Sequence, residues 1–578
     1  MLRFVVIADS HIRPPDQETV AYPSNALLVR RNEVVVDLCN EIAPAFVVHL
    51  GDIVHPLPVE ATHHLALELA GAVYGNLDVP IHFVAGNHDV GDKPNAHVAV
   101  PSVADENYGP FESSWGPAYS SFDQETCHFV TIDAQAMNSG LLRETEQRVW
   151  LESDLSNAHG SGKRIFLFTH YPPFVRDPGE NEHYDNLGEP ARSWFLSLLE
   201  TYNVEAVFSG HVHNFLFNTF GTTDMYVAPS TGFVRPDYAE LSAVSPLGEN
   251  GRDDPAKLGV FVVDITDDGH IVRPVRSFGR TSRPPSLPVD LPSFLEPAWS
   301  NPVGVTLSHS WMSVVDFPTA GLDEFARKRI RNDATLLALW EARITNVAIP
   351  LDDLKTADVS ERVVALSERG IRFTVFSAGV PTADDIAVIL DSGCLADWQI
   401  SAFPAEFGAV VETVASNEIG VPLSFAPIVP VGHAGASVHH FVSVGFDPGN
   451  PELVRDFSER DPDSIFRSFV FRIRHGSDLE AGASMAAEIS ASVDRVPVCL
   501  VELPRAGESE VFDDDDAVAG RVREVARLGV SRPDWKFVLD GFMDHDRGYY
   551  PRHGLIDRRF NPRPAFYELI SGVSRGRR

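Results

Sequence analysis

Five short apolar runs between residues 3 and 213 each end at side chains of the kind that bind metal ions. Apolar runs of this length predict buried strands, and the carboxyl ends of parallel strands meet at one edge of an α/β sheet. The sequence therefore predicts an α/β fold that gathers Asp, Asn and His side chains at one edge. The five runs end in Asp9-Ser10-His11, Gly51-Asp52, Gly86-Asn87-His88-Asp89, Thr169-His170 and Gly210-His211-Val212-His213.

The residue types in this set restrict the metal. A mixture of Asp, Asn and His suits borderline divalent ions such as Mn, Fe, Zn, Co or Ni. The four cysteines are far apart in the chain, which argues against a structural thiolate zinc site. Seven ligands are too many for one ion but suit two ions that share a carboxylate, an arrangement that clamps the attacking and leaving oxygens of a phosphoryl group. We therefore expect two divalent metal ions, with the element left open.

The ordered series Asp-x-His, Gly-Asp, Gly-Asn-His-Asp, His and Gly-His-x-His resembles the signature of the calcineurin-like metallophosphoesterase superfamily, over roughly residues 1–280. The resemblance implies a four-layer αββα sandwich. It also implies a phosphoester hydrolase, either a phosphodiesterase or a phosphatase, that uses a metal-activated hydroxide. One metal would be held by Asp9, His11, Asp52 and His213, and the other by Asp52, Asn87, His170 and His211. His88 would then contact the phosphoryl oxygen or the leaving group, and Asp89 would orient His88 through a hydrogen bond.

Residues 86–92 and 115–122 are similar to the subgroup that includes class III cyclic-nucleotide phosphodiesterases and related phosphatases, which favours a phosphodiesterase. His55 stands where the purple acid phosphatase branch has a tyrosine ligand to ferric iron, so that branch is not expected. Residues 176–188 follow a predicted ligand and form either a lid or a solvated loop. We expect Tyr171, His183 and Tyr184 to bind the substrate.

The rest of the first half predicts helices at 25–42, 59–77 and 144–155, a loop at 91–115, and a hairpin of 258–265 with 270–275. Prolines then crowd residues 281–302, which we interpret as a linker between domains 1–280 and 303–578. After the linker, eight apolar runs alternate with helical stretches, the first of these at 322–343. This alternation predicts a (β/α)₈ barrel.

The tail Gly554 to Tyr567 looks like the ends of glycoside hydrolase barrels. Those enzymes need two facing carboxylic acids. Glu502 ends the seventh run, but the fourth run ends in residues 399–402 without a carboxylate, which favours a substrate-binding or non-catalytic barrel. The alternative function is therefore a carbohydrate-binding protein, or one that acts on a glycan or sugar phosphate through the barrel.

The composition restricts the partners. Among 578 residues, 47 Lys and Arg stand against 81 Asp and Glu, a net charge of −34, so affinity for nucleic acid or an anionic membrane is not expected. Four separated cysteines predict buried free thiols in a reducing compartment. No signal peptide precedes the first strand and no apolar stretch reaches membrane-spanning length. We expect a cytoplasmic protein with a small phosphoester substrate, and the oligomeric state stays open.

Overall fold

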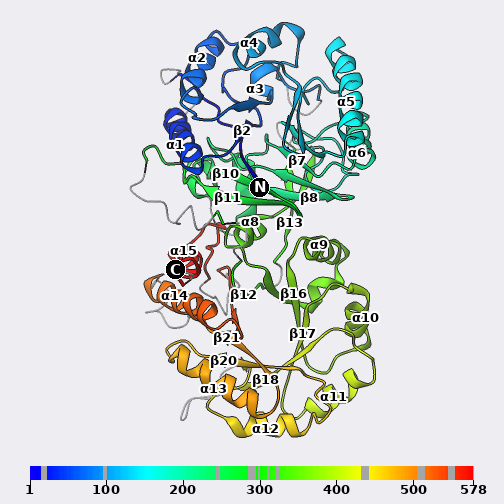
Figure 1. The fold of residues 1–578 in the computed structure, drawn as a ribbon, viewed down its shortest axis with the longest axis vertical. Coiled ribbons are helices and arrows are strands. Elements are labelled where there is room, and N and C mark those ends of the chain that lie inside the picture. The colour runs from blue at the N-terminus through cyan, green and yellow to red at the C-terminus, as the bar shows by residue number, and fades with distance from the viewer. Residues whose placement is uncertain are drawn as a thin grey trace. The chain divides into compact units, whose positions relative to one another are not determined.

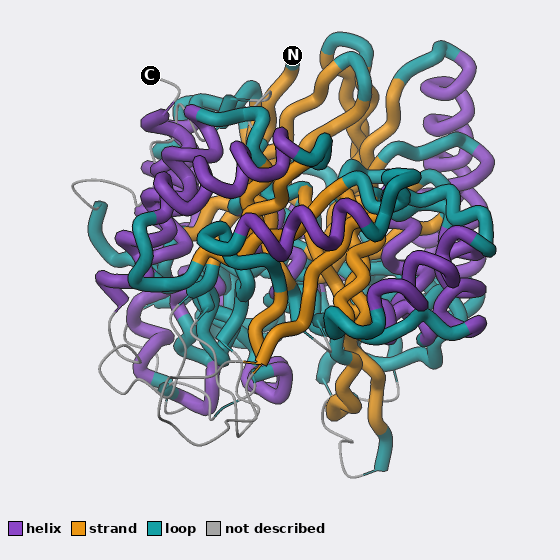
Figure 2. Tube along the Cα trace, turned by 90° about the horizontal axis from the view of Figure 1, so that it is seen from below, coloured by secondary structure: helices purple, strands orange, loops and turns teal. Residues whose placement is uncertain are grey.

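The computed structural model divides the chain into two compact units. Unit 1 consists of Met1–Leu287 with Ser313–Glu341, and unit 2 of Pro288–Met312 with Ala342–Arg578. Most of the predicted linker lies outside the described residues, so its limits stay a prediction. All residues are described except 15–21, 96–99, 243, 245–247, 284–294, 297–299, 309–310, 320–324, 431–441, 504–514, 545–553 and 577–578, which are grey in Figure 2.

Unit 1 contains two large sheets whose central strands are parallel. In the first sheet β1, β2 and β3 are parallel. The predicted hairpin is present as β10–β11, and its strand β10 pairs with β1 in the antiparallel direction. Its strands, in spatial order, are β11 (Gly269–Arg276), β10 (Gly259–Thr266), β1 (Leu2–Ile7), β2 (Phe46–His49) and β3 (Ile81–Phe83). The strands of the second sheet are β4 (Ser120–Gln124), β5 (Cys127–Ile132), β6 (Arg164–Thr169), β7 (Ala206–Ser209), β9 (Thr223–Val227) and β8 (Leu216–Phe220).

Helices cover the outer sides of these sheets, which confirms the predicted αββα sandwich. In Figure 1, α1 and α2 lie on one side of the strands and α5 and α6 on the other. The predicted helices at 25–42, 59–77 and 144–155 are confirmed as α1, α2 and α5. The helices of this part are α1 (Leu28–Ile42), α2 (His63–Tyr74), α3 (Asn87–Val90), α4 (Asp105–Trp115), α5 (Leu142–Gly160) and α6 (Ala191–Thr201).

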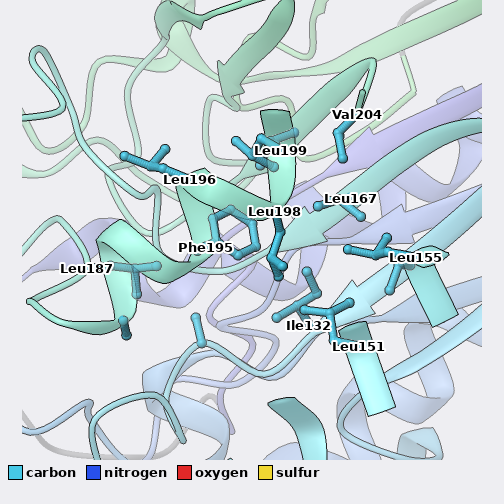
Figure 3. Close-up of a cluster of buried hydrophobic side chains, with 14 of the residues drawn as sticks. Ile132, Leu151, Leu155, Leu167, Leu187, Phe195, Leu196, Leu198, Leu199 and Val204 are labelled. Carbon is cyan, nitrogen blue, oxygen red and sulfur yellow. The ribbon is translucent and has the colours of Figure 1, made fainter. Parts of the chain in front are cut away.

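Aromatic rings fill the space between the two sheets. The Phe4 ring of β1 stacks on Phe46 of β2 at 5.2 Å and meets Phe129 of β5 edge-on at 5.7 Å. A second apolar cluster lies between the second sheet and helices α5 and α6 (Figure 3), where Leu151 and Phe195 are fully buried. Burial of each such side chain contributes about 1.5–3 kcal/mol, so these contacts hold the strand ends in place.

The prediction of a loop over residues 91–115 is wrong for its second half, because Asp105–Trp115 forms α4. Pro110 lies inside this helix, where proline is normally unfavourable. Tyr108 and Phe111 are buried beneath it, at 1% and 0% exposure. Burial of these two rings therefore outweighs the low helix propensity that the sequence shows.

Unit 2 contains a closed barrel of parallel strands, which confirms the predicted (β/α)₈ fold. The pairings of β17 with β18 and of β12 with β22 close the ring. In Figure 1 the strands run inside and α9 to α14 lie outside them. The barrel strands are β12 (Val303–Thr306), β15 (Asn346–Pro350), β16 (Arg372–Ala378), β17 (Asp397–Ala402), β18 (Leu423–Pro430), β20 (Ser468–Ile473), β21 (Val496–Val501) and β22 (Lys536–Leu539), and the short β19 (Val442–Val444) pairs with β18. The helices are α9 (Ala357–Ser367), α10 (Ala383–Ser392), α11 (Phe407–Ala415), α12 (Pro451–Glu459), α13 (Leu479–Ser492), α14 (Asp515–Ser531) and α15 (Pro564–Gly576).

The segment between the first two barrel strands differs from the prediction. The expected single helix at 322–343 is wrong: its described residues form β14 (Arg327–Arg331) and α8 (Ala334–Glu341). β14 pairs with β13 (Val314–Pro318) as an antiparallel hairpin. Burial alternates over the first four residues of β14, where Arg327 and Arg329 are exposed and Lys328 and Ile330 are buried, as a two-residue period requires. This segment belongs to unit 1, so unit 1 is discontinuous in sequence.

Two further observations bear on the predicted environment. In the part of the chain that the structure describes, every helix is too short or too polar to cross a lipid bilayer. The four cysteines are free thiols, and Cys39, Cys127 and Cys499 are buried.

Candidate metal centre

Strand ends of both sheets of unit 1 converge on one polar cluster. In the first sheet, β1 leads into Asp9 and His11, β2 into Asp52, and β3 into Asn87. In the second sheet, β6 leads into His170, and β7 into His211 and His213. All of these side chains are buried, none more than 4% exposed. The structure thus brings together all seven residues that the sequence predicts as metal ligands.

The backbone of this cluster is strained. Asp9, His11, Asp52, His211 and His213 all have φ between 46° and 66°. Residues other than glycine rarely adopt this left-handed region, and such strain concentrates at functional sites. The loops also approach closely, since a Cβ on Gly86 would lie 2.0 Å from the backbone nitrogen of Asp52.

One group of donor atoms comes from Asp9, His11, Asp52 and His213, all within 4.8 Å of one another. The Nε2 atoms of His11 and His213 are 3.0 Å apart, and Nε2 of His11 lies 3.4 Å from Asp52 Oδ2. Asp9 Oδ1 lies 3.5 Å from Nε2 of His213. Two carboxylates and two imidazoles at these distances could hold one divalent ion.

A second group contains Asp52, His170 and His211, also within 4.8 Å. The other oxygen of Asp52, Oδ1, lies 3.4 Å from Nε2 of His170. The side-chain oxygen of Asn87 completes this group, 2.9 Å from Nε2 of His170 and 3.0 Å from Nδ1 of His211. Asp52 therefore presents one oxygen to each group, which is the geometry that a bridging carboxylate needs.

Backbone carbonyls orient two of the histidines. Nδ1 of His170 lies 2.8 Å from the carbonyl oxygen of Leu50, and Nδ1 of His213 lies 2.9 Å from that of Phe233. Because a carbonyl can only accept, both Nδ1 atoms carry the proton and both Nε2 atoms keep a lone pair directed at the cluster. Outer hydrogen bonds of this kind fix metal-binding imidazoles in many proteins.

The pKa values of these histidines favour the neutral imidazole, which is the form that binds a metal ion. Burial, followed by the charge of neighbouring histidines, holds the pKa of His11 well below its usual range, and burial does the same for His211 and His213. Burial and the nearby Asp52 raise the pKa of Asp9 well above its usual range. Asp9 Oδ2 is buried and has no hydrogen-bond partner among the described residues. A positive ion would satisfy this oxygen and accept the lone pairs of neutral imidazoles, so the donor set fits a pair of divalent metals.

His88 is half-buried and belongs to neither of these two groups, but its ring lies with those of His11 and His55 in a third set whose donor atoms are within 4.8 Å of one another. Its backbone N–H donates to Asp52 Oδ1 at 2.8 Å, and its Nδ1 lies 2.5 Å from the carbonyl oxygen of His55. The hydrogen bond expected from Asp89 to His88 is not among those of the described residues. Asp89 instead accepts from the backbone N–H groups of Gly86 and Ile53 at 2.8 and 3.0 Å, because its carboxylate points into the strand ends.

His55 is a residue whose contribution the sequence did not reveal. Its Nδ1 lies 3.3 Å from Nδ1 of His11, and its ring stacks on that of His88 at 5.2 Å. His55 thus supports both neighbours, one through its ring and the other through its carbonyl. No linear motif marks this role, because it depends on the folding of the loop after Asp52.

The three predicted substrate contacts lie in different surroundings. Tyr171 is fully buried and its hydroxyl donates to Asp92 at 2.5 Å. His183 is also buried, with Nε2 3.2 Å from Glu180. Tyr184 is half-buried, and its ring lies 4.6 Å from that of His211. Of the three, Tyr184 has the exposure that a substrate contact requires.

Comparison with known proteins agrees with this geometry. Residues 2–215 match the family model described as calcineurin-like phosphoesterase. These residues form a calcineurin-like phosphoesterase domain. Serine/threonine-protein phosphatase CPPED1 of Mus musculus is 29% identical over 216 residues, covering 35% of this chain and 65% of the relative. CPPED1 of Danio rerio is 31% identical over 195 residues, covering 33% of this chain and 60% of the relative. The chain thus spans less than two thirds of either relative.

A solved structure is also similar to part of the chain. The crystal structure of a dimetal phosphatase from Danio rerio aligns with a TM-score of 0.36 and 14% identity, covering 48% of this chain and 96% of that one.

Proposed function

We propose that unit 1 is a phosphoester hydrolase that works with two divalent metal ions. The observation that carries the proposal is the convergence of seven buried donor residues into two groups that share Asp52. Asp9, His11, Asp52 and His213 would hold one ion, and Asp52, Asn87, His170 and His211 the other. When bound, such ions activate water and neutralise the charge that develops on a phosphoryl group.

Residues of the chain supply the rest of the chemistry. With the His88 Nδ1 proton held by the carbonyl of His55, Nε2 of His88 is the atom left to face the phosphoryl group or its leaving oxygen. Such a group donates a proton to the departing alkoxide when the ring is protonated. Asp89 fixes the loop that carries both Asn87 and His88, because its carboxylate accepts from the backbone N–H groups of Ile53 and Gly86.

The substrate we propose is a phosphomonoester. The relatives named above are called serine/threonine-protein phosphatases, and a phosphorylated side chain is a monoester. This choice replaces the phosphodiester that the subgroup motif favoured. The net charge of −34 is unfavourable for a polyanionic substrate such as a nucleic acid.

A glycosidase activity of the barrel is not proposed. Glu502, after β21, and Asp540, after β22, lie 3.7 and 3.3 Å from the guanidinium of Arg472. Both carboxylates thus contact the same arginine, whereas a glycosidase needs two carboxylic acids that face each other across the substrate. The fourth barrel strand, β17, ends at Ala402 without a carboxylate.

A substrate panel tests the proposal. Metal-stripped full-length protein is supplied with Mn, Fe, Zn, Co or Ni and assayed on p-nitrophenyl phosphate, bis-p-nitrophenyl phosphate, and peptides that contain phosphoserine or phosphothreonine. We expect metal-dependent turnover of the monoesters and a large loss of that turnover in Asn87→Ala. Faster turnover of the diester would refute the choice of monoester, and the absence of metal-dependent turnover on every substrate would refute the hydrolase.

A further inference from the structure

A second polar cluster lies behind the metal centre, around the carboxylate of Asp185. This residue is fully buried. Its Oδ1 accepts from Arg235 at 2.5 Å, and its Oδ2 accepts from the hydroxyl of Tyr238 at 2.9 Å and from the ammonium of Lys328. The buried carboxylate thus has two cationic partners, Arg235 and Lys328.

Lys328 reaches this cluster from a distant part of the sequence. It lies on β14, in the segment inserted between the first two barrel strands, and that segment is part of unit 1. Its side chain is 1% exposed. A buried ammonium is costly unless it is paired, and here the pairing is with Asp185 and, at 3.7 Å, with Asp237.

Apolar contacts hold the hairpin β13–β14 in that position. Phe317 and Ile330 are fully buried in a cluster that also contains Val212, the residue between two predicted ligands. The Phe317 ring lies 5.1 Å from that of Tyr238, which itself bonds to Asp185. Arg331 donates to the carbonyl oxygen of Phe217 on β8 at 2.5 Å. The hairpin is therefore built into the phosphoesterase fold.

Asp185 lies behind His211, a predicted ligand whose outer nitrogen has no backbone carbonyl as its partner among the described residues. His170 and His213 each donate their outer nitrogen to a carbonyl, whereas Nε2 of His211 is buried and has no hydrogen-bond partner among the described residues. That Nε2 lies 3.6 Å from Oδ1 of Asp185. Carboxylates commonly take this outer position behind a metal-binding histidine, where they orient the ring.

We propose that Lys328 is a positioning residue for the metal centre, acting through Asp185 on His211. Lys328 and Arg235 hold the carboxylate of Asp185 behind the outer nitrogen of His211, and the carboxylate keeps Nδ1 of His211 directed at the group that contains Asn87. A segment that interrupts the barrel in the sequence but belongs to unit 1 thus contributes a residue to the phosphoesterase site. The inference rests on the proposed function only in taking these groups as metal sites.

The test uses the full chain and measures metal binding instead of turnover. Metal retention is followed against increasing chelator by elemental analysis, together with the melting temperature of the metal-free protein, for Lys328→Met and for Arg329→Met. Arg329 neighbours Lys328 on the same strand but is 59% exposed and pairs with Asp316 at the surface, so it is the matched control. We expect Lys328→Met to bind one of its two ions about 10–100-fold more weakly, the usual effect of losing an outer partner, and Arg329→Met to bind both as the unaltered protein does.

Asp185→Asn provides a second route to the same result. This variant should also weaken one ion selectively, and adding Lys328→Met to it should cause no further loss, because Lys328 acts through Asp185. Unchanged binding in Lys328→Met, or equal weakening of both ions with a lower melting temperature, would overturn the proposal. If the unaltered protein fails to bind two ions, the proposed function itself is contradicted, so the two failures can be told apart.

Discussion

Replacing His88 by alanine separates proton donation from metal binding. The side chain belongs to neither donor group, while its Nδ1 is held 2.5 Å from the His55 carbonyl. His88→Ala should therefore keep both metals. For an alkyl phosphate, whose leaving alkoxide needs a proton, we expect kcat to fall on the order of 10²-fold or more, which corresponds to about 2.7 kcal/mol of transition-state stabilisation.

The assay compares two substrates on one variant. For nitrophenyl phosphate the loss should be much smaller, because nitrophenolate leaves without a proton. His64→Ala on the exposed face of α2 is the control and should leave both rates unchanged. Loss of metal in His88→Ala would make this residue structural, and equal losses on both substrates would show that it stabilises charge instead of donating a proton.

Further predictions address the metals, the division of the chain and pH. Asp52→Ala should lower the metal content more than Asn87→Ala, because the two oxygens of Asp52 each face one of the two groups. Two full equivalents of bound metal in Asp52→Ala would contradict a bridging role for Asp52. Limited proteolysis should cut between residues 281 and 302. The two fragments should still elute together in gel filtration, because segment 313–341 of the second fragment remains packed in unit 1. Separate elution would contradict that packing. Metal-free protein should lose stability as the pH falls below about 6.5, since the site histidines with lowered pKa stay neutral when folded but protonate when unfolded. The raised pKa values of Asp9, Asp89 and Asp92 act in the opposite sense but are outnumbered by the lowered pKa values of the histidines at the site. A melting temperature that rises on acidification would contradict this balance.

Much of the fold could be predicted because the relevant signals are local. Apolar runs and the polar residues that follow them predicted the strand ends of unit 1, and the hairpin predicted at 258–265 and 270–275 is present as β10 and β11. The ligand series could likewise be read in order along the chain. The loop predicted at 91–115 failed because proline and glycine are conspicuous locally, while burial of Tyr108 and Phe111 depends on the rest of the fold.

The features that escaped prediction depend on contacts between distant residues. Segment 322–343 has enough apolar residues to indicate a helix, but β14 is stabilised by its pairing with β13 and by burial in unit 1. The ion pair of Lys328 with Asp185 joins residues 143 positions apart. Asp89 was expected to contact its sequence neighbour, and only the folded loops show that it accepts from Ile53, 36 residues away.

The most direct test of the dinuclear centre is anomalous diffraction from crystals of the full-length protein grown with Mn²⁺. We expect two anomalous peaks about 3.5–4 Å apart, the usual separation of such pairs, with the carboxylate of Asp52 between them. One peak would be bound by Asp9, His11 and His213, and the other by Asn87, His170 and His211. A single peak, or two peaks that do not share Asp52, would contradict a dinuclear centre bridged by Asp52.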